Sequence, residues 1–160
     1  MTGENEERKI KRLRGFEKVS SQTNNDKIIL PKRKTKNSVA YDIYSPIRTI
    51  IKPKNSIRLN TGIKAYFQDD EALFIIPRSS VGIKHGIRLK NTVGLIDSDY
   101  YNNEDNDGEI ILSLENNSDK DFVIEQGDRI CQAYFQKILF TDNDEFETSL
   151  RVGGLGSTGK

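Results

Sequence analysis

The sequence predicts an all-β domain, and three observations support this prediction. Short apolar runs, each broken by turn residues, recur about every ten residues from Phe16 onward. These runs are rich in Ile, Val, Tyr and Phe, the residues that favour strands. No stretch keeps apolar residues at helical spacing over three turns, which argues against a helix-rich fold. The pattern is typical of a β-sandwich or a barrel.

The apolar runs define the expected elements, and Gly, Pro, Asn and Asp between them mark the turns. The expected strands are residues 27–30, 40–44, 49–51, 56–60, 63–67, 72–77, 87–89, 93–96, 109–115, 121–125 and 129–138. At most one short helical turn is expected, at residues 78–82. There is no internal repeat and no long linker, so residues 15–150 are expected to form one domain. The charged residues 1–14 are expected to be disordered, and the Gly-rich residues 151–160 to form a mobile arm.

The composition limits what kind of protein this is. Only 34% of the 160 residues are hydrophobic and 31% are charged, a thin core for a chain that folds without partner copies. Residues 1–36 hold 11 Lys and Arg against 5 Asp and Glu, a net charge of +6, whereas residues 97–147 hold 3 against 15, a net charge of −12. The basic end is short and has no interleaved aromatic residues, so no nucleic-acid binding is expected.

Cysteine and histidine are nearly absent. One Cys excludes an internal disulfide, and one His excludes a zinc site built on paired histidines. Cys131 is interpreted as a small core residue rather than a nucleophile, and His85 as a solvated loop residue. There is no apolar run of roughly 18 residues and no signal-peptide stretch. A cytoplasmic protein without membrane contact is therefore expected.

A first candidate site is the segment PRSSVG at residues 77–82. Arg78 supplies forked guanidinium donors, and Ser79 and Ser80 supply compact hydroxyl donors, directly after an expected strand. Together these groups can hold an anion. The alternative is an ordinary helix cap, in which a Ser satisfies free backbone N–H groups. The local sequence leaves both interpretations open.

Two carboxylates are further candidates. Asp97 stands at the end of the apolar strand in NTVGLIDSDY, where it can orient and deprotonate a water as a general base. The alternative is an ordinary turn residue at a strand end. Asp42, on the expected strand 40–44, is a possible carboxylate facing a metal ion. Further along, Asp128 and Arg129 can pair with each other or with neighbouring residues.

The end of the sequence, GLGSTGK, matches the first positions of a phosphate-binding P-loop. A P-loop follows a strand, opens a helix and continues with Ser or Thr after the lysine. Here the sequence stops at the lysine, so the P-loop interpretation fails. Two alternatives remain: a Gly-rich strip that closes over a polyphosphate, or an unstructured end.

The order of five segments along the chain is more informative than any one of them. AYDIYS, PRSSVGIKHGI, NTVGLIDSDY, GDRICQ and GGLGSTG resemble the five motifs of the trimeric all-β dUTPases, and the resemblance covers about residues 16–160. It implies a jelly-roll homotrimer with active sites between subunits. The implied reaction converts dUTP and water into dUMP and pyrophosphate, with Mg²⁺ bound to the triphosphate. Such a reaction keeps dUTP low and supplies dUMP for thymidylate synthesis.

The resemblance also implies a role for each matching residue. Asp97 matches the aspartate that activates the water attacking the α-phosphorus, and Asp42 the aspartate that holds the metal through water. Tyr100 matches the aromatic residue under the deoxyribose. The remaining uracil-binding positions are Asn91, Gly94 and Ile96 in a base-reading hairpin, with Leu155 over the base. The implied phosphate-binding residues are Arg78, Ser79, Ser80, Gln132, Arg151, Ser157 and Thr158.

Four features depart from the usual family pattern. Leu155 replaces a Phe that stacks on uracil, Arg151 stands one residue closer to the Gly pair than in many members, and Val39 with Ala40 replaces an Ala-Gly pair. Residues 101–106 look like an insertion. These departures motivate an alternative, a dUTPase-like regulatory module that responds to nucleotide and binds a protein partner. A dCTP deaminase on the same fold is disfavoured, because LIDSDY does not match the glutamate-bearing motif of that family.

Overall fold

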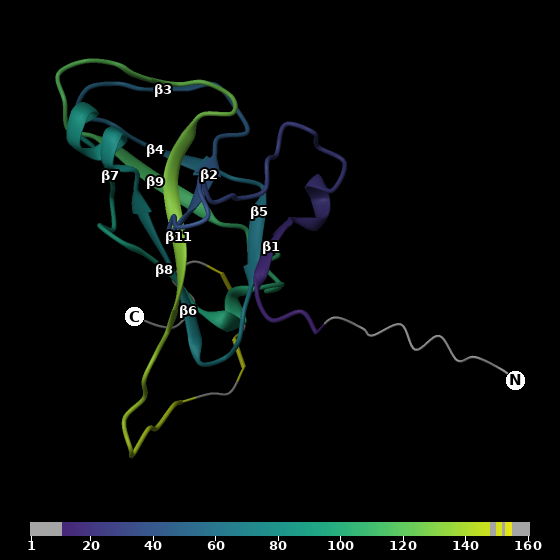
Figure 1. Cartoon of the computed structure of the whole chain (residues 1–160). Helices are drawn as coiled ribbons and strands as arrows, with labels where there is room; N and C mark the ends of the chain where they lie inside the picture. The colour runs from purple at the N-terminus through teal and green to yellow at the C-terminus, as the bar shows by residue number, and fades with distance from the viewer. Residues whose placement is uncertain (1–10, 148–149, 152, 155–160) are drawn as a thin grey trace, which may run out of the picture.

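The computed structural model describes residues 11–147, 150–151 and 153–154 and confirms an all-β fold (Figure 1). Its strands are β1 (Gly15–Lys18), β2 (Tyr41–Tyr44), β3 (Thr49–Ile51), β4 (Ser56–Asn60), β5 (Ile63–Tyr66), β6 (Glu71–Pro77), β7 (Ile87–Leu89), β8 (Gly94–Ile96), β9 (Ile111–Asn116), β10 (Phe122–Ile124) and β11 (Arg129–Lys137). Three short helical turns complete the described part: η1 (Ser20–Gln22), η2 (Ser80–Lys84) and η3 (Ser98–Tyr100). None of these turns is long or apolar enough to cross a membrane.

The strands form small antiparallel sheets rather than one continuous sheet. The largest has the order β2-β11-β6-β8, and a second has the order β4-β9-β7. The pairs β1-β5 and β10-β3 form two further two-stranded sheets. In Figure 1 the long strand β11 runs through the middle of the molecule, and the chain beyond it extends downward before turning back. This jelly-roll arrangement puts sequence-distant strands next to each other.

The core lies on the inner face of the four-stranded sheet. Side chains alternate along a strand, so Cys131 and Ala133 of β11 point inward and are fully buried. Leu73 and Ile75 of β6 share that face with Ile43 of β2, and they belong to the same buried cluster as Leu59, Leu112 and Leu114 of the second sheet. The period-2 pattern of the sequence is thus explained by one buried face per strand.

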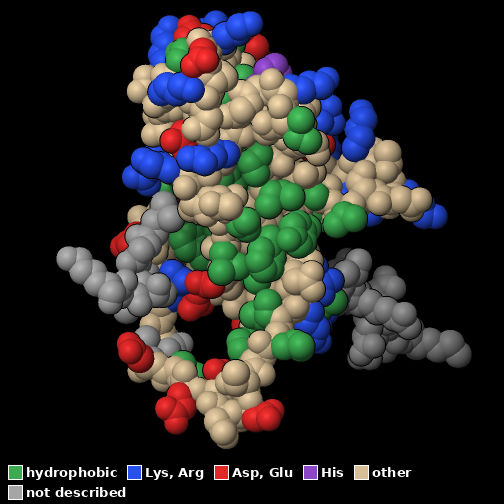
Figure 2. All heavy atoms as spheres, turned by 90° about the vertical axis from the view of Figure 1, so that its left-hand side faces the viewer, with side chains coloured by type: hydrophobic (Ala, Val, Ile, Leu, Met, Phe, Trp, Pro, Cys, Tyr) green, Lys and Arg blue, Asp and Glu red, His purple; other side chains and the backbone are tan. Residues whose placement is uncertain are grey.

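The outer face of the same sheet is also apolar over part of its area. Phe74 and Tyr134 lie directly opposite each other on β6 and β11, and their rings stack with centroids 5.4 Å apart. Leu95 on β8 is the next residue in this row, with 59% of its surface exposed. Figure 2 shows hydrophobic side chains gathered across the middle of the face that it displays. A single chain therefore leaves an apolar surface in contact with solvent.

Most expected strands are confirmed to within two residues, and the differences have physical reasons. Residues 27–30 do not form a strand: the Ile28 N–H closes a turn to the Asn25 carbonyl, and the Ile28 side chain is buried in the core. Residues 90–93 connect β7 to β8 without pairing them, because β7 pairs with β9 whereas β8 pairs with β6. The base-reading role of Asn91 stays a prediction. The expected helical turn occurs at η2, two residues later than predicted, and η1 and η3 were not predicted.

The buried Cys131 allows a simple check of the core. Its burial raises the pKa of the thiol to about 12, and the thiolate is the reactive form. We expect no reaction with a thiol reagent such as DTNB at pH 8 while the chain is folded, and one thiol per chain after unfolding in urea. Rapid labelling of the native protein would contradict this placement.

Candidate functional site

Three of the sequence motifs meet in one cavity of about 590 Å³, here called the basic pocket. Asp42 on β2 and Gln132 on β11 lie opposite each other in the sheet, and Ile76 of β6 is the next residue in that row. Arg78 follows the end of β6, so its side chain reaches the same place. The residues lining the pocket are Lys34, Ser38, Val39, Ala40, Asp42, Ile76, Arg78, Ser79, Ser80, Arg129, Gln132 and Tyr134.

Asp42 holds the two arginines of the basic pocket in position. Its carboxylate accepts a hydrogen bond from Arg129 Nη1 and forms an ion pair with Arg78 Nε, each at 3.2 Å, and the Asp42 side chain is only 10% exposed. Arg78 Nη1 also donates to the Arg129 carbonyl at 3.4 Å. With Lys34, three cations share the lining of the pocket with one carboxylate. This balance suits a polyanion such as a triphosphate.

The same contacts bear on the metal expected at Asp42. Within residues 11–147, 150–151 and 153–154, no group of three or more His, Cys, Asp or Glu side chains is placed to hold a metal ion. Asp42 is moreover engaged by two arginines. Among the described residues of one chain, Asp42 is therefore the only carboxylate of the basic pocket, and a metal ion there would need further ligands such as phosphate oxygens. The role of Asp42 toward that ion stays a prediction.

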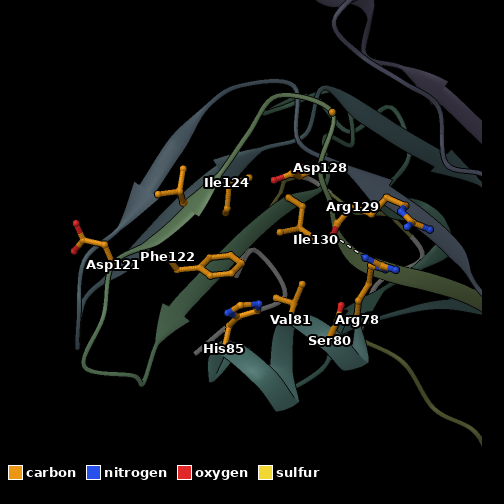
Figure 3. Close-up of a pocket in the computed structure, with 12 residues that line it drawn as sticks. Arg78, Ser80, Val81, His85, Asp121, Phe122, Ile124, Asp128, Arg129 and Ile130 are labelled. Carbon is orange, nitrogen blue, oxygen red and sulfur yellow. Dashed lines mark hydrogen bonds between the residues drawn. The ribbon is translucent and has the colours of Figure 1, made fainter.

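A second cavity of about 480 Å³ is also lined by Arg78 and Arg129 (Figure 3). Figure 3 places these arginines at one end of the cavity and Asp121 at the other. His85 is exposed, as expected, and its ring lies 5.1 Å from that of Phe122. Because this cavity mixes acidic and basic groups, it is less suited to a triphosphate than the basic pocket.

The third motif, NTVGLIDSDY, forms a separate group around Asp97 and Tyr100. Asp97 follows β8, and its exposed carboxylate accepts from Arg151 Nη2. Arg151 Nε donates to Asp99 Oδ1 at 2.7 Å, and the Arg151 side chain is 8% exposed. Tyr100 is buried, and its hydroxyl donates to the Glu109 carbonyl at 2.7 Å. Burial raises the pKa of Tyr100, which keeps its hydroxyl in the neutral, donating form.

The two groups lie at opposite ends of β6. Strand β8 runs antiparallel to β6 with Ile96 opposite Leu73, so Asp97 falls beside the start of β6, next to Ala72. Arg78 lies beyond the other end. Six residues of extended chain span roughly 20 Å, which is too far for both groups to touch one phosphorus atom. Within one chain, Asp97 and the basic pocket do not form a single site.

The comparisons with known proteins place these motifs in a family. The dUTPase family model matches residues 26–159, which is most of the chain. The chain belongs to the dUTPase family. The deoxyuridine 5'-triphosphate nucleotidohydrolase of Lactococcus lactis subsp. lactis (strain IL1403) is 43% identical over 149 residues, covering 92% of this chain and 99% of that protein.

Solved structures agree with the fold of this dUTPase family member. The crystal structure of dUTPase from Streptococcus mutans matches with a TM-score of 0.74 and 40% identity, covering 81% of this chain and 99% of that one. A structure of the dUTPase from phage phi11 of S. aureus matches with a TM-score of 0.69 and 16% identity, covering 86% of this chain and 97% of that one. The second likeness supports the fold alone.

The structure places the predicted site residues of this dUTPase family member in distinct locations. The basic pocket brings together Arg78, Ser79, Ser80, Gln132 and Asp42. The group at the other end of β6 contains Asp97, Tyr100 and Arg151. Leu155, Ser157 and Thr158 lie outside the described residues. Asn91 is exposed in the turn before β8.

Close packing explains the glycine at one of the positions predicted to bind uracil. Gly94 lies opposite Ile75, and a Cβ atom at Gly94 would stand only 3.0 Å from Ile75 Cβ. A larger residue would therefore push β8 away from β6. Ile96 is half-buried on the same strand.

Sequence reasoning missed two cations of the basic pocket. Arg129 was interpreted only as a partner for neighbouring charges, yet it binds Asp42 across the sheet. Lys34 lies in a basic loop that has no motif of its own. The available signal was the position of Arg129 on the strand that carries Gln132. No feature of the sequence distinguishes Lys34 from Lys32 or Lys36.

Proposed function

We propose that this chain hydrolyses dUTP to dUMP and pyrophosphate at sites assembled between the chains of a homotrimer. A site shared between chains is supported by the distance between its parts: the basic pocket and Asp97 lie at opposite ends of strand β6. Family membership supports the reaction. A site containing both groups requires Asp97 of a second copy beside the basic pocket of the first.

The apolar outer face of the four-stranded sheet supports association between copies. Leu95 is 59% exposed, and the stacked pair Phe74 and Tyr134 continues the apolar row. Exposed apolar surface of this kind is typical of a contact between proteins. The row leads along β11 and β6 toward Gln132 and Ile76 at the basic pocket. An interface on this face would therefore bring a second chain close to the pocket.

The basic pocket is suited to binding and orienting the triphosphate. Arg78 and Arg129 are fixed by Asp42, and Ser79 and Ser80 offer donors beside them. Magnesium bound to the substrate would neutralise part of the phosphate charge. Gln132 can donate its amide to a phosphate oxygen. Phosphoanhydride hydrolysis depends mainly on such positioning and charge neutralisation.

Asp97 is the proposed general base. Its carboxylate takes a proton from a water molecule as the water oxygen attacks the α-phosphorus. The new bond joins the water oxygen to phosphorus, the bond from phosphorus to the oxygen bridging the α- and β-phosphates breaks, and pyrophosphate leaves with the bond electrons. In the structure of the single chain, Arg151 is paired with Asp97. A triphosphate that attracts Arg151 would release the carboxylate for this step.

A nucleotide panel tests the proposal. With Mg²⁺ present, we expect pyrophosphate release from dUTP and little release from UTP, dCTP or dTTP. The expected preference for dUTP over UTP follows from Tyr100, the proposed residue under the deoxyribose. The preference over dCTP and dTTP follows from the proposed base-binding residues on β8. Pyrophosphate measured by a coupled assay and the mass of the assembly in solution are the two readouts. Equal rates on all four nucleotides would refute the proposal.

A further inference from the structure

The segment 101–106, which looks like an insertion, is tied to the site by a dense set of hydrogen bonds. Asn106 Nδ2 donates to the Tyr100 hydroxyl at 2.7 Å and to the Glu109 carbonyl at 3.3 Å. Asn103, only 8% exposed, donates from Nδ2 to the Tyr100 carbonyl and to Asn106 Oδ1, both at 2.8 Å. Both ends of Tyr100, its carbonyl and its hydroxyl, are thus held by this one segment.

The segment is itself anchored to the body of the domain. The buried Lys64 on β5 donates to Asn102 Oδ1 at 2.6 Å and to Asp107 Oδ1 at 2.8 Å. The Ser20 N–H donates to Asp107 Oδ2 at 2.7 Å. Gly108 closes the loop with a φ of 82°, and a Cβ atom there would stand 2.8 Å from the Tyr100 carbonyl oxygen. These contacts make the segment a fixed support rather than a loose excursion.

The same segment also contacts the C-terminal arm. The Gly154 N–H donates to Asp105 Oδ2 at 2.8 Å. Upstream in the arm, Arg151 is paired with Asp97 and Asp99, and its guanidinium carbon lies 5.8 Å from the centre of the Tyr100 ring. Through Gly154 and Arg151, the arm therefore contacts the segment 101–106, the Tyr100 ring and the proposed base Asp97.

We infer that residues 101–106 are a positioning element for the reaction: Asn106 fixes the hydroxyl of Tyr100 for deoxyribose selection, and Asp105 docks the arm at Gly154. This inference rests on the proposed function. Tyr100 excludes a 2′-hydroxyl only if its ring cannot shift, and a buried hydroxyl held by Asn106 and Glu109 restricts that shift. Asn106 thus acts through Tyr100 and does not itself touch the nucleotide.

The preference for a deoxyribose over a ribose nucleotide measures the role of Asn106. A double-mutant cycle tests whether Asn106 acts through the Tyr100 hydroxyl. We compare wild type, Asn106→Ala, Tyr100→Phe and the double variant by the ratio of kcat/KM for dUTP to that for UTP. Loss of the hydrogen bond is expected to lower this ratio about tenfold, or about 1.4 kcal/mol, in Asn106→Ala. The double variant should match Tyr100→Phe alone, because Asn106 then has no hydroxyl to hold.

Two outcomes would overturn the role of Asn106: an unchanged ratio of kcat/KM for dUTP to that for UTP in Asn106→Ala, or effects of the two substitutions that multiply in the double variant. Binding of dUMP and UMP by calorimetry repeats the comparison without turnover. A wild type that releases no pyrophosphate from dUTP would refute the proposed function. Equal affinities of Asn106→Ala and wild type for each monophosphate would refute the inference.

Protease access is the readout for Asp105. Arg151 is nearly buried while the arm is docked, so trypsin should release residues 152–160 slowly from the wild type. Asp105→Ala should release this peptide several-fold faster, as followed by mass spectrometry. Glu104→Ala is the matched control, because Glu104 is exposed on the same segment and its replacement removes the same charge. Equal release rates in the two variants would overturn the docking role of Asp105.

Discussion

Replacing Asp97 with Asn should leave a folded, assembled protein whose kcat for dUTP is lower by about 10²–10⁴-fold, the usual cost of losing a general base. The amide keeps the shape of the carboxylate but cannot accept a proton from water. Because the basic pocket, and not Asp97, is proposed to bind the triphosphate, KM should change little. Steady-state rates of pyrophosphate release, with circular dichroism as the folding check, give the measurement.

Asp99→Asn is the matched comparison for this experiment. Asp99 also accepts from Arg151, at 2.7 Å, and the substitution removes the same unit of charge. It should cost less than about tenfold, since it removes one partner of Arg151 and not the base. If both variants lost activity equally, the electrostatic balance around Arg151 would explain the loss and Asp97 would not be the base. Wild-type turnover in Asp97→Asn would directly exclude Asp97 as the general base.

Two inactive variants, Asp97→Asn and Arg78→Ala, should regain activity when their subunits are mixed. Arg78→Ala removes a cation from the basic pocket and leaves Asp42 with one arginine partner. If each site combines the pocket of one chain with Asp97 of another, a mixed trimer can contain a site in which both parts are intact. Activity after joint unfolding and refolding, compared with each variant refolded alone, gives the result.

The control for subunit mixing uses two defects in the same pocket. Arg78 and Gln132 line one cavity within one chain, so a mixture of Arg78→Ala and Gln132→Ala contains no intact pocket. That mixture should stay as inactive as its components. Activity that stays at the sum of the separate variants in the first mixture would contradict a site shared between chains.

The strands were predictable because each buries one face, which leaves a period of two in the sequence. Residues 27–30 show the limit of this signal: Ile28 is as buried as a strand residue, yet its backbone lies in a turn. Periodicity reports burial, not hydrogen-bond partners. Periodicity likewise gave residues 87–89 and 93–96 as strands without revealing that β7 and β8 belong to different sheets.

The site was predictable as a set of residues and not as an arrangement. The motifs gave Asp42, Arg78 and Gln132 in chain order, but their meeting depends on the sheet order β2-β11-β6. The pairing of Asp42 with Arg129 spans 87 positions of sequence, and no local pattern reports such a contact. The separation of Asp97 from the pocket likewise follows from strand register, which a single sequence does not reveal.

The distance along β6 has a consequence for when the reaction can start. A newly folded chain would hold every chemical group that the reaction needs, arranged so that they cannot act together. Hydrolysis would then begin with the encounter of copies and not with the folding of any one of them. Under this view, the concentration of the protein governs its activity twice, through the number of chains and through the fraction of them that have found partners.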